Sequence, residues 1–135
     1  MVEETRLVLE IKSRLGGDFE DKYLIEGELG FGGMGTVLLC QQKDLGRQVA
    51  VKFLSEINDF INRKRFKSEA QHHGSLTHRN IVRVFDYGIS NDVPYIVFEL
   101  LQGQTLAEHL ERRAPLSLLE TLTISIDVCS GLSYA

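Results

Sequence analysis

Long apolar runs, a signal peptide and paired cysteines are all missing from this sequence. No stretch approaches the roughly 18 apolar residues that a helix needs to cross a bilayer, and the N-terminus carries no secretory leader. The two cysteines, Cys40 and Cys129, lie far apart inside apolar runs, which favours buried free thiols over a disulfide or a metal pair. These absences lead us to expect a cytoplasmic protein with no membrane segment in this chain.

The chain also lacks a strong excess of either charge. Its 15 basic and 19 acidic residues give a net charge of −4, which provides no indication of a nucleic-acid partner. Three histidines lie close together, but no cysteine or carboxylate accompanies them at zinc-binding spacing, so surface or helix-capping roles are favoured for His72, His73 and His78. With 135 residues, 43% of them hydrophobic, the chain is long enough for one compact globular domain.

Residues 30–37, Gly-Phe-Gly-Gly-Met-Gly-Thr-Val, match the pattern G-x-G-x-x-G-x-V. The glycines of this pattern allow the backbone to approach phosphate oxygens closely, although a glycine-dense hairpin turn without a ligand fits it too. Apolar and β-branched residues follow at 36–40 and a turn follows at 43–46, so we predict strand, glycine turn and strand. A dinucleotide-binding fold would instead require a helix directly after the glycines.

Two further absences exclude other phosphate-binding loops. The acidic residue that a dinucleotide-binding fingerprint places roughly 20 positions further on is missing, because residues 50–53 read Ala-Val-Lys-Phe. The lysine followed by serine or threonine that ends a Walker-type loop is missing as well. The hairpin interpretation is therefore favoured.

Five short segments have the composition and the alternation of β-strands. In the first of them, the alternation places Tyr23, Ile25 and Leu29 on one face. The last two are joined by a tight turn at Ser90-Asn91-Asp92. The predicted strands are residues 23–29, 36–41, 47–54, 81–89 and 94–101.

An inward-facing lysine and an inward-facing glutamate stand out. In the third strand, Lys52 shares a face with apolar neighbours, where it needs an anionic partner unless it reaches solvent at an edge. In a helix predicted over residues 57–76, Glu69 lies on the apolar stripe that includes Phe66, Ala70 and His73. We therefore predict an ion pair between Lys52 and Glu69; the alternative is that Glu69 lies at the border of the stripe.

Three more helices are predicted from spacing and capping signals. Residues 1–17 place apolar side chains at helical spacing and stop at Gly16-Gly17, which indicates a short amphipathic helix or a frayed extension. Thr105 and Glu108 form a capping box that opens a short helix. Ser117 and Glu120 form a second box, opening a helix towards the C-terminus whose apolar side carries Leu119, Leu122, Ile126 and Cys129.

Taken in chain order, these segments resemble the protein kinase family. The particular residues that fill the motifs are similar to those of its bacterial serine/threonine members. The similar motifs are residues 29–37, the Val-Ala-Val-Lys at 49–52, the Phe-Lys-Ser-Glu-Ala at 66–70, the His-Arg-Asn-Ile-Val at 78–82 and the hinge-like 95–103. The resemblance implies an α+β fold, with a five-stranded antiparallel small lobe and one regulatory helix, followed by the first helices of a large lobe. The implied division is an N-terminal helical extension at 1–17, a small lobe at 18–101 and the start of a large lobe at 102–135.

The resemblance also implies a site for ATP. The backbone of the glycine loop would cover the phosphates, Lys52 would hold the α- and β-phosphates while paired with Glu69, and Phe98 would limit the back of the pocket. Backbone groups of Glu99 and Leu101 would bind the adenine edge. The full set of implied nucleotide-binding residues is Leu29, Gly30, Phe31, Gly32, Gly33, Met34, Gly35, Val37, Ala50, Lys52, Glu69, Phe98, Glu99 and Leu101.

One departure from the family pattern limits the expected activity. The His-Arg-Asp catalytic loop and the Asp-Phe-Gly metal site would follow residue 135, so no catalytic base and no magnesium ligand can be assigned. We therefore expect a truncated serine/threonine kinase that is inactive alone, with Mg²⁺ and a protein substrate bound only by the complete enzyme. The alternative is a non-catalytic, kinase-like interaction or regulatory module.

Overall fold

The computed structural model describes residues 6–32, 35–54 and 59–135. The chain folds as two compact units, one formed by Met1–Ser75 with Arg83–Leu100 and the other by Leu76–Val82 with Leu101–Ala135. Within the described ranges, no helix combines the length and the apolar character needed to cross a bilayer.

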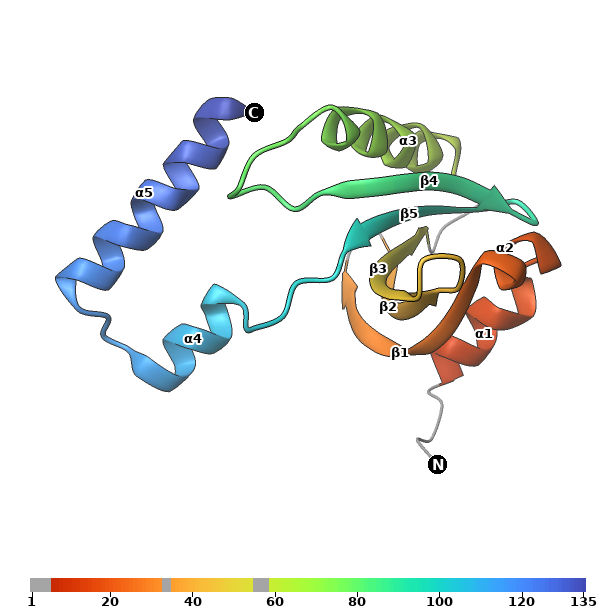
Figure 1. Ribbon diagram of the computed structural model, residues 1–135, viewed down its shortest axis with the longest axis horizontal. Coiled ribbons are helices and arrows are strands. Elements are labelled where there is room, and N and C mark those ends of the chain that lie inside the picture. The colour runs from red at the N-terminus through yellow and green to blue at the C-terminus, as the bar shows by residue number, and fades with distance from the viewer. Residues whose placement is uncertain (1–5, 33–34, 55–58) are drawn as a thin grey trace. The chain divides into compact units, whose positions relative to one another are not determined.

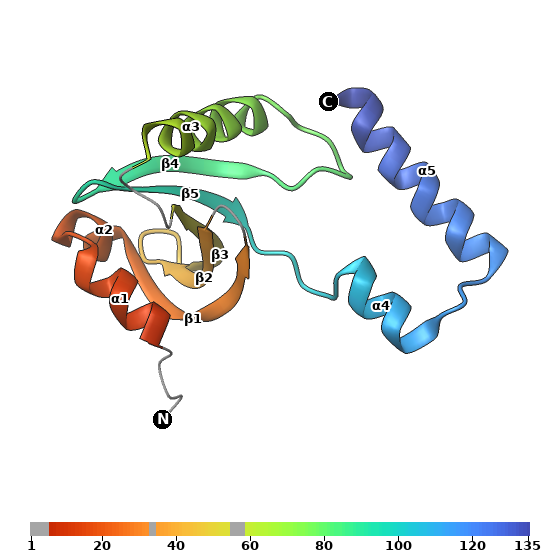
Figure 2. The same ribbon diagram turned by 180° about the vertical axis from the view of Figure 1, so that it is seen from behind.

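The first unit is built on one five-stranded antiparallel sheet, which confirms the predicted fold class (Figure 1). The strand order in the sheet is β1-β2-β3-β5-β4. Two opposite views show α3 lying alongside β4, and α1 and α2 lying beside β1, away from α3 (Figure 1, Figure 2). The strands are β1 (Tyr23–Gly32), β2 (Gly35–Gln42), β3 (Arg47–Leu54), β4 (Val84–Ser90) and β5 (Val93–Glu99).

The two faces of the sheet have separate cores. On one face, β3 contributes Val49, Val51 and Phe53, which are at most 1% exposed, in agreement with the predicted alternation. On the other face, α3 (Phe60–Gly74) packs its Phe66 and Ala70 against β3 and β5. The side chain of Asp59 caps α3 by accepting hydrogen bonds from the N–H groups of residues 61 and 62.

The predicted face of β1 is wrong beyond its first residues. Tyr23 is 3% exposed, but Leu29 is 48% exposed. The register between β1 and β2 shifts twice, between Ile25 and Gly27 and again between Glu28 and Gly30. Because each irregularity changes the face to which later side chains point, simple alternation fails along this strand.

Strand β4 begins three residues later than predicted. Residues 78–81 form a turn, in which the Asn80 N–H donates to His78 Nδ1 and the Ile81 N–H donates to the His78 carbonyl, each at 3.1 Å. The turn between β4 and β5 contains only Asn91 and Asp92, whose φ angles are 45° and 66°. Asparagine and aspartate tolerate this left-handed geometry, which suits a two-residue hairpin.

The N-terminal segment forms two helices, α1 (Arg6–Arg14) and α2 (Gly17–Lys22). The predicted amphipathic helix is present as α1, and its Val8 is 3% exposed. The predicted stop at Gly16-Gly17 is only partly right, because Gly17 begins α2. This second helix spans six residues and buries Phe19 alone, so it has no sequence periodicity that could reveal it.

The second unit contains α4 (Leu106–Arg113) and α5 (Leu118–Tyr134). Both predicted capping boxes are present, one joining Thr105 and Glu108 and the other joining Ser117 and Glu120. Residues 76–82 contact the last turns of α5, where a Cβ on Gly131 would lie 3.2 Å from the carbonyl oxygen of Asn80.

The two thiols have different surroundings. Cys40 is fully buried in β2, as predicted, and no disulfide joins it to Cys129. Cys129 is exposed, so the prediction of a buried thiol at this position is wrong. The neighbouring apolar side of α5 is exposed as well, with Leu119 at 75% and Ile126 at 65%.

Candidate functional site

The glycine-rich turn connects β1 and β2, and its geometry requires glycine at Gly35. There φ is +155°, and a Cβ would lie 2.0 Å from the carbonyl oxygen of Phe53 in β3. Gly32 pairs with Gly35 across the hairpin, and Phe31 is 70% exposed. The predicted phosphate-covering residues Gly33 and Met34 lie outside the described residues. Gly35 thus lies close against the strand that carries Lys52.

The predicted ion pair between Lys52 and Glu69 is confirmed. The Lys52 Nζ donates a hydrogen bond to Glu69 Oε1 at 2.8 Å, and the two side chains are 19% and 24% exposed. The ammonium also lies 5.8 Å from the centre of the Phe66 ring. Because both charged groups keep some contact with solvent, the ammonium can bind a further anion while Glu69 fixes its position.

Strand register brings several predicted site residues to one face of the sheet. Val37 of β2 lies directly opposite Lys52 of β3. Ala50, two residues before Lys52, lies opposite Phe98 of β5. Since residues paired across neighbouring strands share a face, Val37, Ala50, Lys52 and Phe98 line the same surface. The structure thus presents apolar side chains beside an anchored ammonium, a combination that suits a ring system bearing an anionic group.

His73 is a neighbour of this surface that the sequence reasoning missed. Its ring lies edge-on to the Phe98 ring, with centroids 6.3 Å apart, and its buried Nδ1 has no hydrogen-bond partner among the described residues. The carbonyl of His73 accepts the N–H of Ser75 at the end of α3, in line with the predicted capping role, but its half-buried ring packs on Phe98, which was not predicted. The available signal was its position one helical turn after Glu69 on the apolar stripe.

The other two histidines fit the predicted roles more closely. His72 is exposed in the last turn of α3, where its carbonyl accepts the N–H of Ser75. His78 organises the turn before β4. Among the described residues, no group of three or more histidine, cysteine or acidic side chains is arranged to hold a metal ion.

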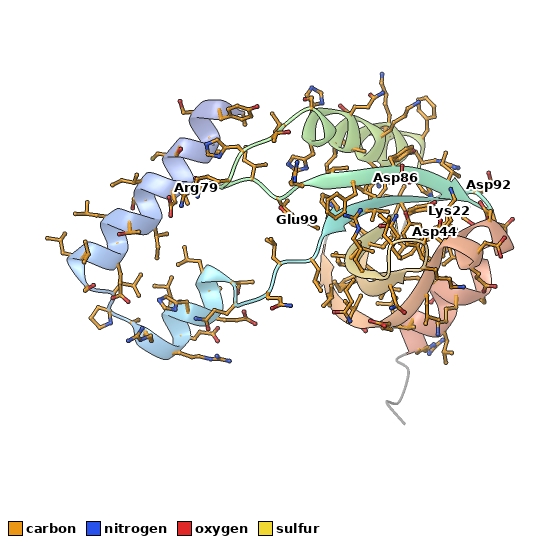
Figure 3. All side chains as sticks on the ribbon, in the orientation of Figure 1. Lys22, Asp44, Arg79, Asp86, Asp92 and Glu99 are labelled. Atoms are coloured by element: carbon orange, nitrogen blue, oxygen red, sulfur yellow. The ribbon has the colours of Figure 1, made fainter. Side chains whose placement is uncertain are left out.

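Glu99 lies at the end of β5, where the chain leaves the sheet (Figure 3). Its N–H donates to the carbonyl of Arg83 at 3.0 Å, and its Oε1 accepts the Arg83 N–H at 2.7 Å. Because its N–H is already bonded to Arg83, Glu99 would contact an adenine ring through its carbonyl oxygen. Leu101, the other predicted adenine contact, belongs to the second unit, and Leu29 presents a half-exposed side chain.

Comparison with known proteins gives consistent matches. The family model described as protein kinase domain matches residues 23–135. The serine/threonine-protein kinase PrkC of Bacillus subtilis is 38% identical over 125 residues, which cover 90% of this chain and 19% of PrkC. The serine/threonine-protein kinase PknB of Mycobacterium tuberculosis is 35% identical over 121 residues, 85% of this chain and 19% of PknB.

A solved structure agrees with these sequence matches. The crystal structure of the Mycobacterium tuberculosis PknI kinase domain superposes with a TM-score of 0.72 at 30% identity, covering 84% of this chain and 47% of that chain. The chain thus spans about a fifth of the length of the curated relatives and less than half of the solved kinase domain.

Proposed function

Because the chain belongs to the protein kinase family, as the N-terminal portion of a kinase domain, we propose that its first unit is the ATP-binding small lobe of a protein serine/threonine kinase. The complete enzyme would transfer the γ-phosphate of ATP to serine or threonine side chains of a protein substrate. In this proposal residues 102–135 begin the large lobe. The observation that carries the proposal is the 2.8 Å ion pair between Lys52 and Glu69.

The described residues fit a nucleotide. Lys52 would bind the α- and β-phosphates, with Glu69 holding the ammonium in place. The glycine turn would cover the phosphates from above, and Val37, Ala50 and Phe98 would enclose the adenine ring. ATP supplies the phosphoryl group, and the contribution of this part of the chain is to orient it and to neutralise its charge. The family uses Mg²⁺ with ATP, but we assign no Mg²⁺ ligand to the described residues.

We propose the cytoplasm as the place of action. The nucleotide substrate supports this location, and so do the two free thiols, because a buried and an exposed cysteine without a disulfide suit a reducing compartment.

The role of Lys52 can be tested in a kinase domain completed by the large-lobe segment of a relative such as PknI. We expect Lys52→Met to lower phosphorylation of a generic protein substrate by at least about 100-fold, because the phosphates lose their positioned ammonium. Lys67→Met is the matched control, since Lys67 is exposed on α3. Equal activity of the Lys52→Met and Lys67→Met proteins would contradict the proposal.

A non-catalytic interaction module is the second candidate function. The exposed apolar side of α5, which includes Leu119 and Ile126, favours it because such surfaces often mark protein contacts. The same completed domain separates the two candidates. A completed, folded domain that binds no nucleotide would favour the interaction module, whereas phosphotransfer that depends on Lys52 would favour the kinase.

A further inference from the structure

The segment formed by α1 and α2, residues 6–22, lies before the region that matches the kinase family model, yet it is part of the core of the first unit. The Phe19 side chain is 1% exposed. Its ring centroid lies 5.0 Å from that of Tyr23, 5.3 Å from that of Phe53 and 5.0 Å from that of Tyr95. Aromatic rings at these separations bury large areas and attract one another. The segment is therefore a built-in element of the fold.

Hydrogen bonds also fasten this segment to the end of β4 and to the turn that follows it. The fully buried hydroxyl of Ser90 accepts the N–H of Gly16 at 2.9 Å and donates to Asp18 Oδ1 at 2.5 Å. The side-chain amide of Asn91 donates to the carbonyl of Arg14 at 3.0 Å. Since these bonds join residues more than 70 positions apart in the chain, they fix α1 and α2 against the sheet.

Helix α1 lies behind the strands that carry the nucleotide-facing residues. Leu7 and Ile11 line a small cavity of about 50 Å³ together with Thr36 of β2 and Phe53 of β3. Thr36 directly follows the glycine turn, and Phe53 directly follows Lys52. Because successive side chains of a strand point to opposite faces, residues packed under α1 and residues facing the nucleotide are neighbours on one backbone. A shift of that backbone moves both.

We infer that residues 6–22 are a positioning element for the nucleotide site, in which α1 and α2 support β2 and β3 from behind and so fix the Lys52 ammonium relative to Glu69. That the ligand is a nucleotide rests on the proposed function. That α1 and α2 support β2 and β3 is a property of this chain alone. A hydrogen bond of 2.8 Å is lost after a displacement of less than 1 Å, so small movements of β3 are sufficient to open the pair.

The experiment compares two serine substitutions on α1 in the 135-residue chain. Val8→Ser removes a buried apolar contact, and Leu9→Ser is the matched control because Leu9 is 52% exposed on the same helix. The readout is the rate at which an amine-reactive acetylating reagent modifies Lys52, measured by mass spectrometry relative to the exposed Lys67. Circular dichroism selects a temperature at which both variants are folded. We expect about a tenfold faster modification of Lys52 in Val8→Ser and no change in Leu9→Ser.

A second variant covers the case in which Val8→Ser fails to fold. Asn91→Gly removes the hydrogen bond to Arg14 without burying or exposing apolar surface, and glycine accepts the positive φ at this position. We expect about a threefold faster modification of Lys52 in this variant. Unchanged Lys52 modification in a folded Val8→Ser chain, or in Asn91→Gly where Val8→Ser is unfolded, would overturn the inference.

Nucleotide binding is measured separately on the same proteins with a fluorescent ATP analogue and Mg²⁺. If the Val8→Ser chain binds the analogue more weakly than the Leu9→Ser chain, the positioning of the nucleotide site is supported directly. The proposed function is tested separately in the kinase domain completed by the large-lobe segment of a relative. If that completed domain binds no nucleotide, the proposed function fails. The acetylation comparison still decides whether residues 6–22 position Lys52, because it uses no nucleotide.

Discussion

Cys40 is a thiol enclosed by the core of the sheet. Its side chain is fully buried in β2, and this burial, together with the smaller effect of the Glu26 carboxylate, raises the pKa of the thiol from the ordinary 9.0 to about 12. Because the folded state holds the proton more tightly, the stabilisation is complete below pH 9 and is lost as the pH rises towards 12. Cys129, by contrast, is exposed on α5.

This difference predicts selective alkylation. At pH 8, iodoacetamide should modify Cys129 readily, while Cys40 should react slower by on the order of a thousandfold, since both its thiolate fraction and its access are reduced. Mass spectrometry of the native chain over time measures both rates. Denaturant is the control, because unfolding should make the two rates similar. Equal rates in the native chain would show that the core around Cys40 is open.

Some side-chain contacts of the first unit were predictable from the sequence, and others were not. The pairing of Lys52 with Glu69 was predictable because each charge lay on an otherwise apolar face and needed a partner. The hydrogen bonds of Glu99 could not be predicted from the sequence. Its N–H and its carboxylate bind the backbone of Arg83, which comes near only because β4 pairs with β5. The packing of His73 on Phe98 depends on the same tertiary arrangement.

At the scale of elements, the two helices of the second unit begin with reciprocal capping boxes. The pKa of Glu108 is lowered by hydrogen bonds from the backbone and the side chain of Thr105. The pKa of Glu120 is lowered by hydrogen bonds from the side chain and the backbone of Ser117. In both cases the carboxylate is the form that the cap binds, so a depressed pKa reports a stabilised helix start.

These caps predict a loss of helix in acid. A lowered folded-state pKa gives stabilisation that is present above the ordinary value of 4.5 and disappears as the pH falls through the folded-state pKa. Helical circular dichroism should therefore decrease as the pH falls below 4.5. The double variant Glu108→Gln and Glu120→Gln should flatten this part of the titration, whereas Glu111→Gln, outside both capping boxes, should keep it. An unchanged titration in the double variant would contradict a capping role.

Element boundaries were predicted best where a local chemical signal marks them. The capping boxes fixed the starts of α4 and α5, and the asparagine-aspartate turn fixed the β4–β5 hairpin. Local signals failed where tertiary contacts decide. Helix α2 exists because Phe19 completes an aromatic cluster, and β1 changes face because its pairing with β2 is irregular.

At the scale of the whole molecule, the two units differ in how they bury apolar side chains. The first unit buries a cluster of apolar residues on each face of the sheet, while other apolar residues, such as Phe31 and Leu45, stay exposed. In the second unit, six aliphatic residues of α5 are at least 50% exposed, namely Leu118, Leu119, Leu122, Ile126, Val128 and Leu132. Fully burying each such side chain is worth about 1.5–3 kcal/mol, which in sum is comparable to the stability of a whole domain. Burial of this side of α5 against another surface would therefore be strongly favourable in free energy.

The 135-residue chain should consequently self-associate through α5. Light scattering coupled to size-exclusion chromatography should show a mass that rises with concentration, because contact between chains removes these side chains from water. The double variant Leu119→Ser and Ile126→Ser should shift the chain towards the monomer, since it removes two of the most exposed apolar groups. Leu45→Ser is the matched control, because Leu45 is 62% exposed in the first unit. Equal association of the double variant and the control would show that the chains associate through a surface other than α5. A weaker association of the double variant alone would identify α5 as the surface that a complete kinase domain or a partner must cover.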